Sequence, residues 1–185
     1  MTTITEQEPT MKATITKPSD REIRIERIFN APRERVWQAM TDPGLVAQWW
    51  GRGNKLVVER LEVERGGHWR FVEHGPDGVH GFEGRFREVT PPERIVQTFE
   101  WDGMPGHVIV ETGTLEDLGD GRTRFVNVSL FHTTDERDGM LQSGMEGGPV
   151  SYTHLTLPSR FAVRAGSTSF TTSLPGGAVG TFVWK

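Results

Sequence analysis

The chain of 185 residues is long enough for one domain with a substantial hydrophobic core, and its 21 basic and 25 acidic residues leave it mildly negative. This charge argues against nucleic acid or an anionic membrane as a partner, and no apolar run is long enough to cross a bilayer. The lack of cysteine excludes disulfides, a thiolate nucleophile and cysteine-ligated zinc, and it is compatible with a reducing, cytoplasmic setting.

The N-terminal region is expected to consist of a flexible leader followed by a strand. Residues 1–20 are polar and lack the apolar segment of a secretory signal, although 13–16 could form a short strand. Charged and apolar residues then alternate over residues 21–29, so that Ile23 and Ile25 share one face. This alternation predicts a strand with one buried side.

Two short helices are predicted directly after this strand. Asn30 and Asp42 are placed to cap them, and Pro32 suits a first helical turn because no amide donor is lost there. The second helix ends with adjacent tryptophans, Trp49 and Trp50, whose side chains cannot point the same way from a helix. We expect one of them to pack inward and the other to line a portal.

The rest of the first 148 residues predicts an antiparallel meander and a last helix. Turns rich in glycine, proline and aspartate separate alternating segments, which gives about seven strands in all. Thr133 and Glu136 form a capping box, so a helix is expected to start near residue 134. The six predicted strands after the helices are approximately 56–64, 68–73, 79–89, 94–101, 107–117 and 123–132.

The chain changes character at about residue 149. All 25 acidic residues precede this point, and the remainder is rich in Ser, Thr, Gly and β-branched residues. At the earlier acidic content, a segment of this length without an acid would arise roughly once in a thousand times. Residues 149–185 are therefore expected to be an atypical tail, the product of a shifted reading frame or adaptor sequence, with a genuine divergent C-terminal extension as the alternative. In either case the tail is expected to be disordered or to form loosely placed strands.

Five segments carry a pattern that is typical of one family. Residues 30–51 contain Ala-Pro, Val-Trp, Asp-Pro and Trp-Trp-Gly in that order, and further family-like motifs lie at 66–71, 84–89, 92–96 and 137–147. Together they resemble the activator of heat-shock protein 90 ATPase homologue (AHSA-type) family of the START-like, or SRPBCC, superfamily, and they suggest a bacterial chain. Fold does not fix function, so the resemblance speaks first to architecture.

The resemblance covers residues 21–148 and implies an α+β helix-grip fold. In this fold a curved antiparallel sheet grips a long C-terminal helix and encloses an apolar cavity. In this chain the helix is expected to be truncated, because the family pattern stops near residue 148. Part of the concave face would then lose its cover.

Aromatic and methionine side chains are the best candidates for lining such a cavity, although the same pattern suits an ordinary core. His80 is added because it shares strand parity with Phe82 and Phe86 and could hydrogen-bond a ligand. The predicted ligand-binding residues are Trp49, Trp50, Trp69, Phe71, His80, Phe82, Phe99, Trp101, Met140 and Met145.

Glu111 and His80 are weak candidates for catalysis. Glu111 shares parity with Ile109 and Leu115, and burial against apolar groups would raise the pKa of its carboxyl toward neutrality. A solvated outer-face glutamate is the plainer interpretation. The histidines lack the spacing typical of zinc sites, so neither a metal nor another cofactor is expected.

Three functions remain open for a monomer or homodimer of this kind. The leading interpretation is a non-enzymatic module that binds a small hydrophobic or amphipathic molecule. The first alternative is a polyketide cyclase-like enzyme in which a buried Glu111 or His80 moves a proton. The second is an interaction protein that stimulates a chaperone ATPase, as the family name implies.

Overall fold

The computed structural model describes residues 13–51, 53–142, 169–173 and 179–183, the last two ranges by their backbone. The chain divides into two units, Met1–Leu155 and Thr156–Lys185. In the second unit, β9 (Ser169–Ser173) and β10 (Val179–Val183) form an antiparallel pair. The predictions for residues 1–12 and for the rest of the tail lie outside the described residues.

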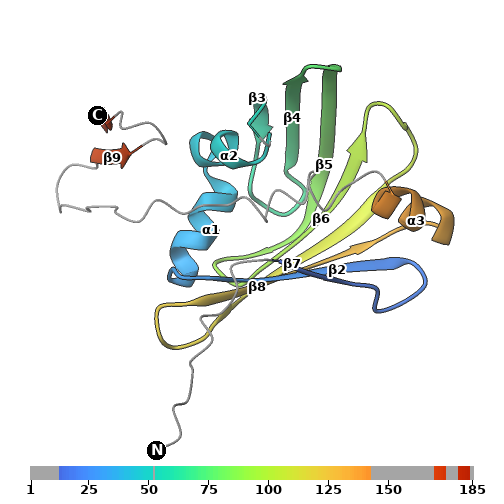
Figure 1. The fold of residues 1–185 in the computed structure, drawn as a ribbon, viewed down its shortest axis with the longest axis horizontal. Coiled ribbons are helices and arrows are strands. Elements are labelled where there is room, and N and C mark those ends of the chain that lie inside the picture. Colours follow the sequence, from blue (N-terminus) through green and yellow to red (C-terminus); the bar gives the residue numbers. More distant parts are fainter. Residues whose placement is uncertain (1–12, 52, 143–168, 174–178, 184–185) are drawn as a thin grey trace, which may run out of the picture. The chain divides into compact units, whose positions relative to one another are not determined.

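The first unit contains a strongly curved antiparallel sheet of eight strands (Figure 1). Its order is β1-β2-β8-β7-β6-β5-β4-β3, so β2 lies beside β8 although about ninety residues separate them. The strands are β1 (Thr14–Thr16), β2 (Glu22–Phe29), β3 (Lys55–Leu61), β4 (His68–Gly75), β5 (Gly78–Thr90), β6 (Arg94–Trp101), β7 (Ile109–Asp117) and β8 (Thr123–Leu130).

All seven predicted main strands are present. The sheet has eight strands, one more than predicted. The additional strand is β1, inside the predicted leader, where Ile15 pairs with Ile25 of β2. This pairing packs Ile15 against the buried apolar cluster of β2, which gives the short strand a hydrophobic reason to bind the sheet edge.

Three helices accompany the sheet: α1 (Arg33–Thr41), α2 (Pro43–Trp49) and α3 (Thr134–Gln142). Figure 1 shows α1 and α2 near β3, and α3 at the opposite end. None of the helices in the described ranges is both long and apolar enough to cross a membrane.

Two of the three predicted helix caps are confirmed. The Asp42 carboxylate accepts a hydrogen bond from the Leu45 amide at 3.0 Å, and the Thr133 hydroxyl accepts one from the Glu136 amide at 3.2 Å. The prediction for Asn30 is wrong. Helix α1 starts later, with Pro32 at the N-cap position and no side-chain cap.

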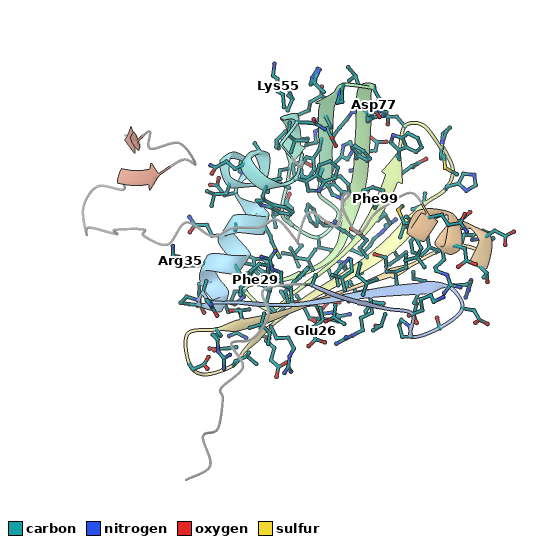
Figure 2. The ribbon with its side chains drawn as sticks, viewed as in Figure 1. Glu26, Phe29, Arg35, Lys55, Asp77 and Phe99 are labelled. Atoms are coloured by element: carbon teal, nitrogen blue, oxygen red, sulfur yellow. The ribbon has the colours of Figure 1, made fainter. Side chains whose placement is uncertain are left out.

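Alternation along the strands separates a buried concave face from a solvated convex face. Ile23 and Ile25 of β2 are 0% and 2% exposed. Figure 2 shows Glu26 and Phe29 on opposite sides of the same strand, and it places Phe99 on the inner side of the curve. The core therefore lies on the concave side, where the candidate site is found.

Candidate ligand-binding site

A large apolar cavity lies between α3 and the concave face, and we call it the α3 cavity. Its volume is about 530 Å³. This is within the range of about 300–1,000 Å³ that is common for small-molecule pockets. The described residues that line it are Phe82, Phe99, Trp101, Met104, His107, Ile109, Phe131, Asp135, Glu136, Gly139 and Met140.

Three polar contacts hold the surroundings of the α3 cavity in place. The Arg137 guanidinium is buried and donates to the Ser19 carbonyl at 3.1 Å, which ties α3 to the segment before β2. His107 Nδ1 lies 2.7 Å from Glu136 Oε1 and joins the β6–β7 loop to α3. Arg70 and Asp102 form a two-bond ion pair at 2.7 and 3.1 Å where that loop begins.

Five aromatic rings form a closed series of contacts at the inner end of this cavity, and we call them the aromatic cluster. Neighbouring ring centroids are 4.8–5.9 Å apart, which is the usual range for favourable aromatic pairs. In order around the series they are Trp50, Phe71, Trp69, Phe99 and Phe82.

On the other side of the aromatic cluster lies a second, smaller cavity, which we call the Glu111 cavity. Helices α1 and α2 cover it and the concave face forms its floor. Its volume is about 60 Å³, enough for about two water molecules. Its described lining is Trp37, Met40, Val46, Trp49, Trp50, Leu61, Trp69, Phe71, Phe86, Glu93, Arg94, Ile95, Gln97, Glu111, Gly113, Leu115, Phe125 and Asn127.

Glu111 has an unusual electrostatic setting for a strand glutamate. Cross-strand neighbours hold both of its carboxylate oxygens: Gln97 Nε2 donates to Oε2 at 3.0 Å and Ser129 Oγ donates to Oε1 at 3.4 Å. Burial raises the pKa of the Glu111 carboxyl, and hydrogen bonds from Gln97, Ser129 and Asn127 oppose that rise. The net direction is upward, so desolvation dominates.

The structure assigns the predicted ligand-binding residues to two cavities rather than one. Phe82, Phe99, Trp101 and Met140 line the α3 cavity. Four others, Trp49, Trp50, Trp69 and Phe71, line the Glu111 cavity. Met145 lies outside the described residues.

Two orientation predictions need correction. Trp49 and Trp50 are 8% and 7% exposed, so both pack inward and neither is left at an open portal. Trp49 turns toward α1, where its indole nitrogen donates to the Ala39 carbonyl at 2.8 Å. His80 lines neither of the two cavities, because it lies near the turn end of β5, 3.7 Å from Asp77, with its ring against Trp101.

The sequence prediction missed the polar residues beside Glu111 and the small residues of the cavity walls. Gln97, Asn127 and Ser129 occupy inward positions of β6 and β8, and strand parity could have found them. Gly113 and Gly139 carry no side chain that signals a cavity. Within the described ranges, no group of three histidine, aspartate or glutamate side chains is placed to hold a metal ion.

Substituting Glu111 by glutamine tests its electrostatic setting. In the folded protein the pKa of Glu111 is raised, so the protonated acid stabilises the fold. This contribution is complete below the ordinary pKa of a glutamate and is lost as the pH rises through the raised pKa. The Glu111→Gln variant is therefore expected to be more stable than the parent at pH 8, by on the order of 1 kcal/mol, and less so at pH 5. Urea unfolding at both pH values measures this.

Glu116→Gln on the same strand is the matched control. Glu116 is 60% exposed and pairs with Arg124 at 2.8 Å on the convex face, so its loss should cost less than about 1 kcal/mol. If Glu111→Gln gives the same stability difference at pH 5 and pH 8, burial does not set the ionisation of Glu111.

The arrangement of strands and helices identifies the fold of the first unit. An open curved antiparallel sheet, two helices after the first long strand and a helix after the last one are the elements of the α+β helix-grip fold. A profile of the family described as "Activator of Hsp90 ATPase homolog 1-like protein" matches residues 30–156. The chain belongs to this family. A search of curated protein sequences gave no match.

Solved structures of bacterial proteins share this architecture. A crystal structure from Rhodobacter sphaeroides is 28% identical, with a TM-score of 0.69 over 78% of this chain and 95% of that one. A solution structure from Arthrobacter aurescens is 25% identical, with a TM-score of 0.69 over 76% and 87%. Protein Ms6760 from Mycobacterium smegmatis, at 23% identity, has a TM-score of 0.67 over 77% and 93% and supports the fold alone.

Proposed function

We propose that this protein binds a small hydrophobic or amphipathic molecule in the α3 cavity. The observation that carries the proposal is the size of this cavity, about 530 Å³, together with its aromatic and aliphatic lining. An apolar guest that displaces water from such a lining gains roughly 25 cal/mol for each Å² of apolar surface removed from water. We place this activity in the cytoplasm, because a chain without cysteine suits a reducing compartment.

The polar groups of the α3 cavity support an amphipathic guest. Asp135, Glu136 and His107 line one side, and Glu136 and His107 are already paired with each other. Ile109 and Phe131, which also line the cavity, are buried in the apolar cluster that includes Ile23 and Ile25. A guest with an apolar body and one polar end would match both sides.

Filling the α3 cavity tests the proposal. Nile red, a neutral apolar dye, is expected to bind the full chain saturably and with one-to-one stoichiometry. Gly139 lines the cavity, and a Cβ added there meets no atom within 4 Å. The Gly139→Leu side chain can therefore enter the cavity, and it should weaken Nile red binding at least about tenfold, since each 1.4 kcal/mol of lost contact corresponds to that factor.

Gln142→Leu is the matched control, because it adds the same side chain to an exposed position of α3 outside the cavity lining. It should leave dye binding within about twofold of the parent. Dye binding that is not saturable, or that both leucine variants weaken equally, would count against the α3 cavity as the binding site.

A further inference from the structure

The Glu111 cavity places one carboxylate among aromatic walls. Helix α1 contributes Trp37, the C-cap of α2 contributes Trp50, and the sheet supplies Trp69, Phe71 and Phe86. Glu111 lies on the floor, on the inward row of β7. The cavity is separate from the α3 cavity, because the aromatic cluster lies between them.

The hydrogen-bond partners of Glu111 are neutral in charge and donate to it. Gln97 and Ser129 bind its two oxygens, and Asn127 donates in turn to Ser129 Oγ at 3.3 Å. This donor set suits a carboxylate anion, since each bond favours the charged form. Among the described residues, no salt bridge to Glu111 is present to offset the cost of burying that charge.

The two other charged residues of the cavity lining already have partners. Glu93 Oε1 lies 3.2 Å from Arg33 Nη1, and Arg94 Nε lies 3.1 Å from Glu88 Oε1. These pairs are partly exposed and mark the mouth of the cavity, between the start of α1 and the turn before β6. Because Glu93 and Arg94 are already paired, Glu111 is the carboxylate left to bind a cation inside the cavity.

Aromatic faces and a carboxylate together are the chemistry that recognises an ammonium group. A cation within about 6 Å of an indole or phenyl centroid is stabilised by the ring quadrupole, and the effect grows when the cation is desolvated. The volume of about 60 Å³ admits a head group as large as about two water molecules. It is too small for a drug-sized molecule.

We infer that the Glu111 cavity is a binding site for a primary ammonium group, carried either by a small free amine or by the head of a longer alkylamine. Glu111 is the counter-ion, Gln97 and Ser129 hold its carboxylate in place, and the indole and phenyl rings enclose the cation. This inference stands apart from the proposed binding of an apolar guest in the α3 cavity.

The ionisation of Glu111 agrees with this assignment. Without a guest, burial raises the pKa of its carboxyl, and a bound ammonium would restore the anion. Affinity for an amine should therefore increase as the pH rises through the raised value. Glu93 and Arg94 are the other charged groups that line the cavity.

The test is calorimetric titration of the full chain at pH 8 with ethylamine, n-octylamine and n-octanol. Both amines are expected to bind saturably, and n-octanol at least tenfold more weakly than n-octylamine at this site. If ethylamine and n-octylamine bind with equal affinity, the guest is a small free amine. If n-octylamine binds more tightly, the guest is a longer alkylamine whose chain makes contacts of its own. Equal affinities for n-octylamine and n-octanol would overturn the inference.

Two variants separate charge from space. Glu111→Gln keeps the shape and removes the anion, and it should weaken ethylamine binding at least tenfold. Gly113→Val keeps the anion and fills the cavity next to it, since a Cβ at Gly113 meets its nearest atom at 3.5 Å, an ordinary contact. It should also weaken ethylamine binding at least tenfold, and undiminished binding in both variants would overturn the inference.

The two binding proposals fail separately in these experiments. Nile red binding should persist in Glu111→Gln and Gly113→Val, and ethylamine binding should persist in Gly139→Leu. Far-ultraviolet circular dichroism confirms that each variant is folded. If the parent protein binds ethylamine but not Nile red, the ammonium site is supported and the proposed function of the α3 cavity is contradicted. If it binds Nile red but not ethylamine, the proposed function is supported and the ammonium site is contradicted.

Discussion

Replacing Trp69 by alanine is expected to lower the free energy of unfolding by about 3–5 kcal/mol. Trp69 is 2% exposed and is the largest fully buried side chain among the described residues. It contacts Phe71 at 4.9 Å and Phe99 at 5.9 Å between centroids, so its removal opens the aromatic cluster and merges part of its space with the Glu111 cavity. The surrounding strands cannot close this space, because their hydrogen bonds fix their separation.

Urea unfolding followed by circular dichroism measures the loss. Trp69→Phe keeps an aromatic ring in place and should cost less than the alanine variant. Trp101→Ala removes the same side chain from a half-buried position and is the matched control, with an expected cost below that of Trp69→Ala. Equal losses for Trp69→Ala and Trp101→Ala would show that the aromatic cluster does not organise the core.

Replacing Gly84 by alanine is expected to destabilise the sheet by about 3 kcal/mol or more, at the upper end of overpacking effects. A Cβ at this position would lie 1.8 Å from the Thr98 carbonyl oxygen and 2.6 Å from Trp69 Nε1. Gly84 pairs with Trp69 across β4 and β5, so the missing side chain makes room for the indole. The chain cannot avoid the clash by a rotamer change, because the Thr98 oxygen belongs to the backbone of β6.

Gly139→Ala is the control for this substitution. Its added Cβ meets no atom within 4 Å, and alanine is favoured over glycine in a helix by about 1 kcal/mol, so this variant should be as stable as the parent or more so. The double variant Trp69→Ala, Gly84→Ala separates the two contacts at Gly84. Removing the indole leaves the clash with the Thr98 oxygen, so the double variant should be less stable than Trp69→Ala alone. If the two are equally stable, the clash with the indole, and not the one with Thr98, causes the loss of stability in Gly84→Ala.

The sequence predicted the elements of the fold well because those signals are local. Asp42 lies one position before Pro43, a residue type that is favoured at the first position of a helix, and it caps α2 as expected. The alternation over β2 fixes which residues share a face, independently of what the strand pairs with. Asn30 failed as a cap because an Ala-Pro pair allows the helix to begin after the proline, and the sequence does not state which residue ends the extended segment.

The candidate site was predicted only in part. Parity put Glu111 on the same face as Ile109 and Leu115, and the structure places it there, in the lining of the Glu111 cavity. The plainer interpretation, a solvated glutamate on the outer face, is wrong, because the register of β6, β7 and β8 surrounds this carboxylate with inward side chains. Parity also placed His80 inward with Phe82, yet His80 lies at the end of β5 beside the exposed Asp77, beyond the cavities. Alternation along a strand predicts which face of the sheet a side chain lies on. It does not predict where a cavity ends, because that depends on which elements cover the face.

Local sequence signals were thus enough to predict the order of strands and helices, the caps of α2 and α3, and the apolar side of strands such as β2, because periodicity, turn residues and capping act over a few neighbouring positions. The pairing of β6, β7 and β8 brings Gln97, Glu111 and Ser129 into one row, and no local signal in the sequence indicates this. Only the tertiary structure shows that the aromatic cluster divides the concave side into two cavities. These features follow from the register and curvature of the sheet, which join residues far apart in the chain and leave no local mark.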